Sequence, residues 1–118
     1  MTTTLYHNPR CTKSRAALQH LEEKNIKFNL VTYLDAGLTE VEIVEILSLL
    51  NMPAKDMIRK EEAVFKELGL SLEDTEATLV AAIAQNPILF ERPVLVKDNK
   101  AVIGRPAEKL VEFVSANF

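Results

Sequence analysis

The sequence predicts an α/β protein with a four-stranded mixed β-sheet and helices on its faces. Two observations near the ends of the chain support this fold class. Residues 3–34 alternate strand-like, helix-like and strand-like patterns, as in a unit that places two strands in parallel. Residues 93–118 combine two short apolar runs around a turn-prone pair with a final helical pattern. The residues between these parts are mostly helical in pattern, so the predicted order is β-α-β, a helical insertion, then β-β-α.

The first unit consists of two strands and one helix. Residues 3–7 are β-branched and aromatic, and the Asn-Pro pair that follows breaks the strand. From residue 13 to residue 24 the apolar side chains recur at helical spacing. Residues 27–34 are rich in apolar side chains and predict a largely buried second strand.

The middle of the chain is predicted to be helical. Thr39 and Glu42 form a capping-box pattern before an apolar stripe that ends at residues 51–53. Residues 54–67 predict one or two short helices. Ser71 with Asp74 resembles another cap, and residues 77–85 predict a further helix.

The last part of the chain predicts a β-hairpin followed by a helix. Residues 93–106 hold two apolar runs around Asp98-Asn99. Pro106 stands where a first-turn proline is favourable, and apolar residues at helical spacing follow it. Two parallel strands plus this hairpin give a thioredoxin-like topology with helices inserted between the halves.

Composition excludes several classes of function. The 118 residues suit one domain, which we expect to span residues 1–118. A net charge of -3 argues against a nucleic-acid binder driven by overall charge. No apolar run approaches the roughly 20 residues of a membrane span, and residues 1–8 lack the pattern of a secretory signal. A single cysteine without an export signal is typical of a cytoplasmic protein.

That cysteine, Cys11, is the strongest candidate for chemistry. It lies in a polar loop just before a predicted helix, with Arg10, Lys13 and Arg15 close in sequence. Positive charge and the N–H groups at a helix N-terminus both lower a thiol pKa and favour the nucleophilic thiolate. The same N–H groups can hold an oxyanion. We therefore expect a thiolate beside an anion site.

Other readings of Cys11 fit the sequence less well. A free cysteine is often a small buried hydrophobe, but the neighbours here are polar or loop-forming. One cysteine and two histidines do not supply four metal ligands, so no metal site is expected. Ser14 occupies the second position of a C-x-x-C motif, which leaves a monothiol that needs an external thiol. Ala17 stands where the C-x5-R loop of low-molecular-weight phosphatases requires arginine.

Three arginines far along the chain could serve an oxyanion. Arg92 and Arg105 each precede a proline and flank the two hairpin strands, and Arg59 lies in the middle region. Loop ends beside strands are common positions for site residues, and the planar guanidinium group of arginine binds oxyanions through two parallel hydrogen bonds. Any one of these arginines alone would be read as a solvated surface residue.

Four motifs in order closely resemble the arsenate reductase family of the glutaredoxin-coupled type, which has a thioredoxin-like fold. They are "YHNPRCTKSR", "RKEE", "NPILFERPVLV" and "AVIGRP", and they span nearly the whole chain. The resemblance implies that Cys11 attacks arsenate and that Arg59, Arg92 and Arg105 bind the oxyanion. It implies a cis proline at Pro93. It also implies supporting roles around the thiolate for His7, Asn8, Ser14 and Arg15.

The resemblance also implies a thiol route. Cys11 would form a covalent adduct with arsenate, glutathione would act as cosubstrate, and glutaredoxin would be a transient partner, with no bound cofactor. Arg10 departs from the small residue of the best-known reductases, and the chain resembles the shorter chromosomal branch. Two alternatives stay open: a glutathione-dependent thiol-disulfide oxidoreductase without arsenate activity, and a regulator resembling the Spx transcription factors that bind RNA polymerase.

Overall fold

The computed structural model describes residues 2–118, which divide into two compact units. One unit comprises residues 2–36 and 92–118 and contains the whole β-sheet. The other comprises residues 37–91 and is helical. The sheet unit is therefore assembled from the two ends of the chain, as the predicted order of elements requires.

The sheet has four strands in the order β2-β1-β3-β4. β1 runs parallel to β2 and antiparallel to β3, and β3 runs antiparallel to β4. This confirms the predicted four-stranded mixed sheet. The strands are β1 (Thr3–Tyr6), β2 (Asn29–Val31), β3 (Val94–Lys97) and β4 (Lys100–Ile103).

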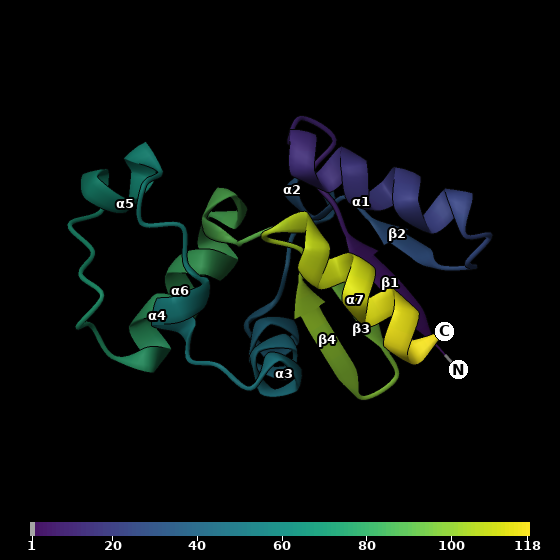
Figure 1. The fold of residues 1–118 in the computed structure, drawn as a ribbon. Helices are drawn as coiled ribbons and strands as arrows, with labels where there is room; N and C mark the ends of the chain where they lie inside the picture. The colour runs from purple at the N-terminus through teal and green to yellow at the C-terminus, as the bar shows by residue number, and fades with distance from the viewer. Residues whose placement is uncertain (1) are drawn as a thin grey trace. The chain divides into compact units, whose positions relative to one another are not determined.

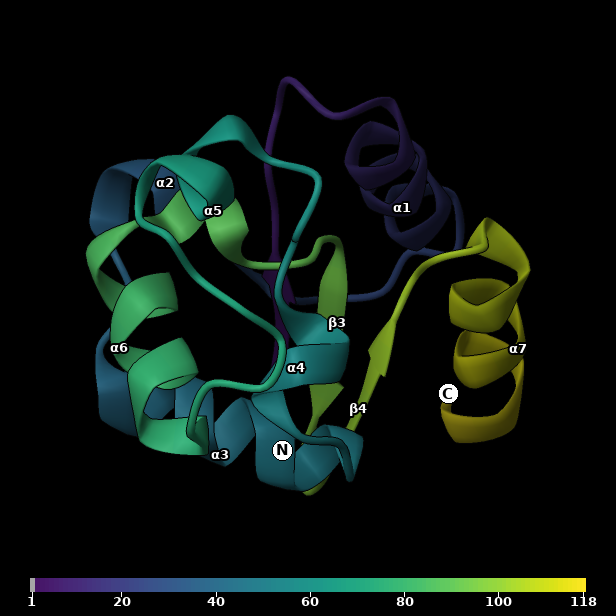
Figure 2. The ribbon, with the colours of Figure 1, turned by 90° about the vertical axis from the view of Figure 1, so that its left-hand side faces the viewer.

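Two helices, α1 (Thr12–Glu23) and α7 (Ala107–Asn117), lie side by side on one face of the sheet (Figures 1 and 2). Their inward residues join residues of the two central strands in one apolar cluster. Truncating one buried leucine of such a cluster to alanine costs about 2–5 kcal/mol. This cluster fixes the start of α1 relative to the sheet. Its buried members are Leu5, Ala17, Leu21, Leu95, Leu110 and Val114.

The second strand is shorter and less buried than predicted. Only residues 29–31 form β2, and two of the three are exposed. β2 is an edge strand and pairs with β1 alone, so its outer side has no neighbour in the sheet. The chain then turns into a short helix, α2 (Tyr33–Ala36), where Tyr33 is fully buried. The predicted strand over residues 27–34 is therefore wrong at both ends.

The hairpin forms as predicted, with one correction beyond it. Asp98 adopts a positive φ of 54° in the turn between β3 and β4, a conformation that Asp tolerates better than most residues. Pro106 is the N-cap of α7 and not its first residue. Its ψ of 166° is extended, so the proline lies outside the helix. The bonds before Pro106 and Pro93 are both cis.

The helical unit contains four α-helices and one 3-10 turn among residues 37–91. The first, α3, begins with the predicted capping box, in which the Thr39 side chain and the Glu42 side chain each bond the other's backbone N–H. α3 ends at Asn51, which adopts a left-handed conformation with φ 57°. The elements are α3 (Glu40–Leu50), α4 (Ala54–Met57), α5 (Ala63–Glu67), α6 (Glu76–Gln85) and η1 (Pro87–Leu89).

The cap predicted at Ser71 is a turn without a helix. Asp74 accepts from the N–H of Ser71, and the Ser71 hydroxyl accepts from the N–H of Glu73. α6 begins five residues later and is capped by Thr75, whose side chain accepts from the N–H of Thr78. Of the helices over residues 2–118, none is both long and apolar enough to cross a membrane.

Candidate active site

Cys11 is the N-cap residue of α1, at the end of the loop that leaves β1. Its backbone carbonyl accepts from the N–H of Arg15 at 2.9 Å, and its own N–H donates to the Asn8 carbonyl at 3.0 Å. The side chain is half-buried. The thiol therefore stands where the unpaired N–H groups of the first helical turn concentrate positive potential.

The loop before Cys11 is held by a small buried network. Ser14 has no exposed surface, and its hydroxyl contacts His7 Nδ1 at 2.7 Å and accepts from the N–H of Asn8 at 3.0 Å. His7 and Asn8 are also buried. The Asn8 side-chain oxygen accepts from the N–H of Arg10 at 3.0 Å, and the Asn8 carbonyl accepts from the N–H of Cys11. These hydrogen bonds fix the backbone of residues 8–11.

Arg15 fastens the same loop from the surface of α1. Its Nη1 donates to the carbonyl of Pro9 at 3.0 Å, and its Nη2 donates to the Thr12 hydroxyl at 3.3 Å. These contacts span the loop on either side of the nucleophile. Arg15 thus orders the chain around Cys11 through its own hydrogen bonds.

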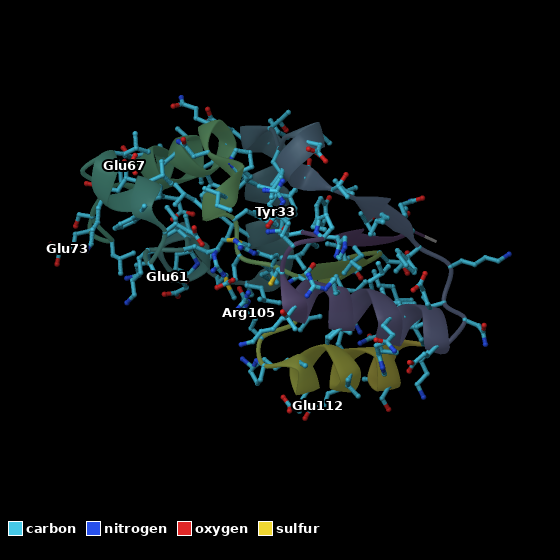
Figure 3. All side chains as sticks on the ribbon, turned by 90° about the horizontal axis from the view of Figure 1, so that it is seen from above. Tyr33, Glu61, Glu67, Glu73, Arg105 and Glu112 are labelled. Atoms are coloured by element: carbon cyan, nitrogen blue, oxygen red, sulfur yellow. The ribbon has the colours of Figure 1, made fainter. Side chains whose placement is uncertain are left out.

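Two arginines from the hairpin region reach the thiol. Arg105 Nη2 donates to Cys11 Sγ at 3.2 Å, while its Nε donates to the backbone carbonyl of Arg92 at 2.7 Å. Figure 3 labels Arg105, which lies in the connection between β4 and α7, beside the beginning of α1. Arg92 is buried, and its side chain also forms a hydrogen bond with the thiol that lowers the thiol pKa. The sheet therefore brings residues 92 and 105 to residue 11.

The pKa of Cys11 is lowered from the ordinary value of a thiol. Burial, the largest single influence, raises the pKa because it disfavours the charged thiolate. The backbone N–H groups of Ser14 and Lys13, a hydrogen bond from Arg92 and the charge of Arg105 all lower the pKa, and together they outweigh burial. The arrangement stabilises a thiolate, the reactive form of cysteine.

His7 is not a protonated partner for this thiolate. Burial lowers the pKa of His7, the charge of Arg15 lowers it further, and hydrogen bonding with Ser14 acts in the opposite sense. A neutral imidazole can accept a hydrogen bond from the Ser14 hydroxyl through Nδ1, and the Ser14 oxygen can then accept from the N–H of Asn8.

The hairpin reaches the site through a close approach of Gly104 to Pro93. The N–H of Gly104 donates to the Pro93 carbonyl at 2.8 Å. A Cβ at residue 104 would lie 2.9 Å from Pro93 Cγ and 3.2 Å from Leu110 Cδ1. Glycine is therefore required where the two Arg-Pro segments meet. The sequence contains Gly104 and two Arg-Pro pairs, but it does not predict the contact between Gly104 and Pro93.

Arg59 belongs to the helical unit and is surrounded by carboxylates. Its Nε donates to Glu62 at 3.0 Å and its Nη1 donates to Glu91 at 2.7 Å, while Glu61 lies 3.8 Å from Nη2. Burial lowers the pKa of Arg59, but the bonds and charges of Glu62 and Glu91 raise it overall. Arg59 is therefore firmly charged and already paired.

The predicted site residues thus fall into two groups. The structure gathers eight of them in the sheet unit and leaves Arg59 in the helical unit. Over residues 2–118, no three His, Cys, Asp or Glu side chains lie together as metal ligands would. The eight are His7, Asn8, Cys11, Ser14, Arg15, Arg92, Pro93 and Arg105.

Comparisons with known proteins agree on one family. The ArsC family model matches residues 6–113. An arsenate reductase of Neisseria meningitidis is 42% identical over 108 residues, covering 90% of this chain and 92% of its own. The uncharacterized protein YfgD of Escherichia coli is 39% identical over 112 residues, covering 93% and 94%.

The fold agrees with the same assignment. The solved structure of an arsenate reductase from Vibrio cholerae matches with a TM-score of 0.89 at 35% identity, covering 95% of this chain and 97% of that one. The mixed sheet with flanking helices is thus a thioredoxin-like α/β fold. Sequence and structure together show that the chain belongs to the ArsC family, the arsenate reductases.

Proposed function

We propose that the protein reduces arsenate to arsenite, with Cys11 as the nucleophile and glutathione and glutaredoxin as the external thiols. The observation that carries the proposal is the contact of Arg105 Nη2 with Cys11 Sγ at 3.2 Å, beside a thiol whose pKa is lowered. We propose arsenate as the substrate because the chain's relatives include proteins named arsenate reductase.

In the first step the Cys11 thiolate attacks arsenic. An S–As bond forms, and one arsenate oxygen leaves with protons as water. Arsenate is an anion, so a thiolate that approaches it is repelled. The guanidinium groups of Arg92 and Arg105 offset this repulsion and stabilise the charge on the oxygens as the bond forms.

In the second step a glutathione thiolate releases the arsenic as arsenite. Its thiolate attacks Cys11 Sγ, an S–S bond forms, and the electrons of the S–As bond leave with arsenic as arsenite. Arsenic(V) is reduced to arsenic(III), and two thiols are oxidised to one mixed disulfide. A glutaredoxin thiolate then attacks the glutathione sulfur of that disulfide; glutathione is transferred to glutaredoxin and Cys11 leaves as the thiolate. An external thiol is required because Cys11 is the sole cysteine in the 118 residues.

Arg59 has a less direct part in the proposal. The family resemblance makes it a third oxyanion-binding arginine, and its charge is balanced by Glu62 and Glu91. An anion that binds Arg59 must compete with these two carboxylates. A cytoplasmic location, where glutathione keeps thiols reduced, also stays a prediction.

The test is arsenate-dependent NADPH consumption in a coupled assay with glutathione, glutaredoxin and glutathione reductase. Turnover that disappears in Cys11→Ser would support the proposal, provided that thermal unfolding shows the variant to be folded. Loss of turnover in Arg92→Ala would support an anion site beside the thiol. A folded protein with a reactive thiol and no arsenate turnover would refute arsenate reduction.

A second candidate function is favoured by the lowered thiol pKa alone. A thiol-disulfide oxidoreductase that uses glutathione requires an activated Cys11 but no oxyanion site. The same coupled assay with a glutathione mixed disulfide in place of arsenate separates the two. Turnover with the disulfide, but not with arsenate, would assign this second function.

A further inference from the structure

The basic side chains next to Cys11 differ in whether they have partners. Arg15 and Arg105 use their guanidinium groups in hydrogen bonds within the site. Arg10 is exposed, and no residue of the described chain accepts a hydrogen bond or forms an ion pair with its guanidinium. A charged group therefore remains available to solvent at the residue that precedes the nucleophile.

The backbone of Arg10 is nonetheless fixed. Its N–H donates to the Asn8 side chain at 3.0 Å, and the next N–H, that of Cys11, donates to the Asn8 carbonyl at 3.0 Å. Adjacent Cα atoms are about 3.8 Å apart, so the Arg10 side chain starts within one residue of the reacting sulfur. The Cα of Arg10 therefore has a fixed position, while its guanidinium group is exposed to solvent.

The second thiol must approach Cys11 after arsenate has bound, and it comes from solvent. Glutathione carries two carboxylates and one ammonium group, which gives a net charge of -1 near neutral pH. A tripeptide spans at most about 10 Å, so its carboxylates lie within reach of a side chain rooted beside its target sulfur. Arginine is well suited to a carboxylate because two parallel N–H groups match its two oxygens.

We propose that Arg10 binds a carboxylate of glutathione and thereby selects glutathione over neutral thiols at Cys11. The inference rests on the proposed function, in which glutathione attacks the Cys11 sulfur. It assigns Arg10 to the external thiol and leaves arsenate to the arginines that act on the Cys11 thiol, Arg92 and Arg105. Arg10 is then a specificity residue for the second substrate.

The test uses a reaction that does not involve arsenate. The Cys11 thiolate attacks glutathione disulfide, a mixed disulfide forms, and a glutathione thiolate leaves. The rate constant is compared with that for 2-hydroxyethyl disulfide, which is neutral. The ratio of the two rate constants cancels any change in the reactivity of the thiolate itself, so it reports recognition of the glutathione charges.

Arg10→Gln should lower this ratio by roughly three- to ten-fold, as expected for one exposed charge-assisted contact. Arg10→Lys should lower it less because the charge remains. The diethyl ester of glutathione disulfide, with its glycine carboxylates blocked, should give the wild-type protein a lower ratio if those carboxylates are the ones bound. Added salt should reduce the wild-type preference more than that of Arg10→Gln.

Lys27→Gln is the matched control, since it removes the same charge from an exposed position beyond the far end of α1. Twelve helical residues span about 18 Å, so Lys27 is distant from Cys11. Equal ratios in wild type, Arg10→Gln and Lys27→Gln would overturn the inference.

The coupled assay separates this inference from the proposed function. Arsenate turnover with a KM for glutathione that is the same in wild type and Arg10→Gln would overturn the role of Arg10 alone. A glutathione preference that depends on Arg10, without any arsenate turnover, would support the role of Arg10 and refute arsenate reduction.

Discussion

Replacing Arg105 with glutamine should raise the pKa of the Cys11 thiol. The guanidinium Nη2 lies 3.2 Å from Sγ, and the charge of Arg105 is one of the influences that hold the thiol pKa down. Glutamine keeps a polar side chain but removes the positive charge. The thiolate then loses its contact with this cation, while the hydrogen bond from Arg92 and the backbone N–H groups at the start of α1 remain.

The size of the effect follows from the distance. Two unit charges 3.2 Å apart interact by about 1.3 kcal/mol in bulk water and by about 5 kcal/mol at an effective dielectric constant near 20. Cys11 is half-buried, so the value for this pair should lie toward the lower end. We therefore expect Arg105→Gln to lose about 1–3 kcal/mol of thiolate stabilisation, seen as a rise in the thiol pKa.

The assay is the rate of alkylation of Cys11 by iodoacetamide as a function of pH. As the sole cysteine of the 118 residues, Cys11 gives the entire signal. Arg105→Lys should show a smaller rise because the charge remains, and Lys27→Gln should show none. A pKa in Arg105→Gln within a few tenths of wild type would refute the electrostatic reasoning, and the thiolate would then be stabilised mainly by Arg92 and the N–H groups of α1.

Three further predictions concern stability. The unfolding free energy should fall as the pH drops from about 6.5 toward the lowered pKa of His7, because burial keeps His7 neutral in the folded chain while the unfolded chain takes up the proton; urea titrations should show no such fall in His7→Gln. Gly104→Ala should destabilise by about 1–3 kcal/mol in urea titrations, because its Cβ would lie 2.9 Å from Pro93 Cγ; an unchanged midpoint would contradict the packing argument. Arg59→Met should cost roughly 2–4 kcal/mol in the same assay, since it removes the cation that bonds the partly buried Glu62 at 3.0 Å and Glu91 at 2.7 Å; Glu91→Gln, which keeps an acceptor, should cost less.

The sequence predicts those elements whose signals are local. The capping box of Thr39 and Glu42 is closed within four residues, and the structure forms it as expected. Ser71 and Asp74 show the limit of the same signal, since they close a turn, and the next helix begins only at Glu76 with Thr75 as its N-cap. A side chain that satisfies nearby N–H groups stabilises a helix start and a loop equally well.

The length and burial of β2 could not be predicted in the same way. Its residues alternate as in a buried strand, but burial depends on whether a second neighbour pairs with the strand. β2 pairs with β1 alone, and the chain enters α2 at Tyr33. The order of strands in a sheet is a property of the whole fold and is not contained in the pattern of one strand.

The site shows the same division between local and distant information. The spacing around Cys11 predicts a thiolate at a helix start, because the charged residues and the helix are adjacent in sequence. The carboxylates around Arg59 were not predicted, since Glu91 is 32 residues away. Arg59 and Glu91 lie together because Ile58 pairs with Phe90 in an isolated bridge and the N–H of Arg59 donates to the Leu89 carbonyl at 2.8 Å.

These pairings imply that activation of the thiol and the function of Arg59 can be separated by experiment. The groups that lower the pKa of Cys11 belong to residues 2–36 and 92–118. Arg59 is not among these groups, and Glu62 and Glu91 bond its guanidinium group. Arg59→Met should therefore leave the pKa of Cys11 within a few tenths of wild type, as measured by alkylation, while it raises the KM for arsenate. A clear rise in the thiol pKa would mean that Arg59 stabilises the thiolate itself, and the three arginines would then act as one electrostatic group.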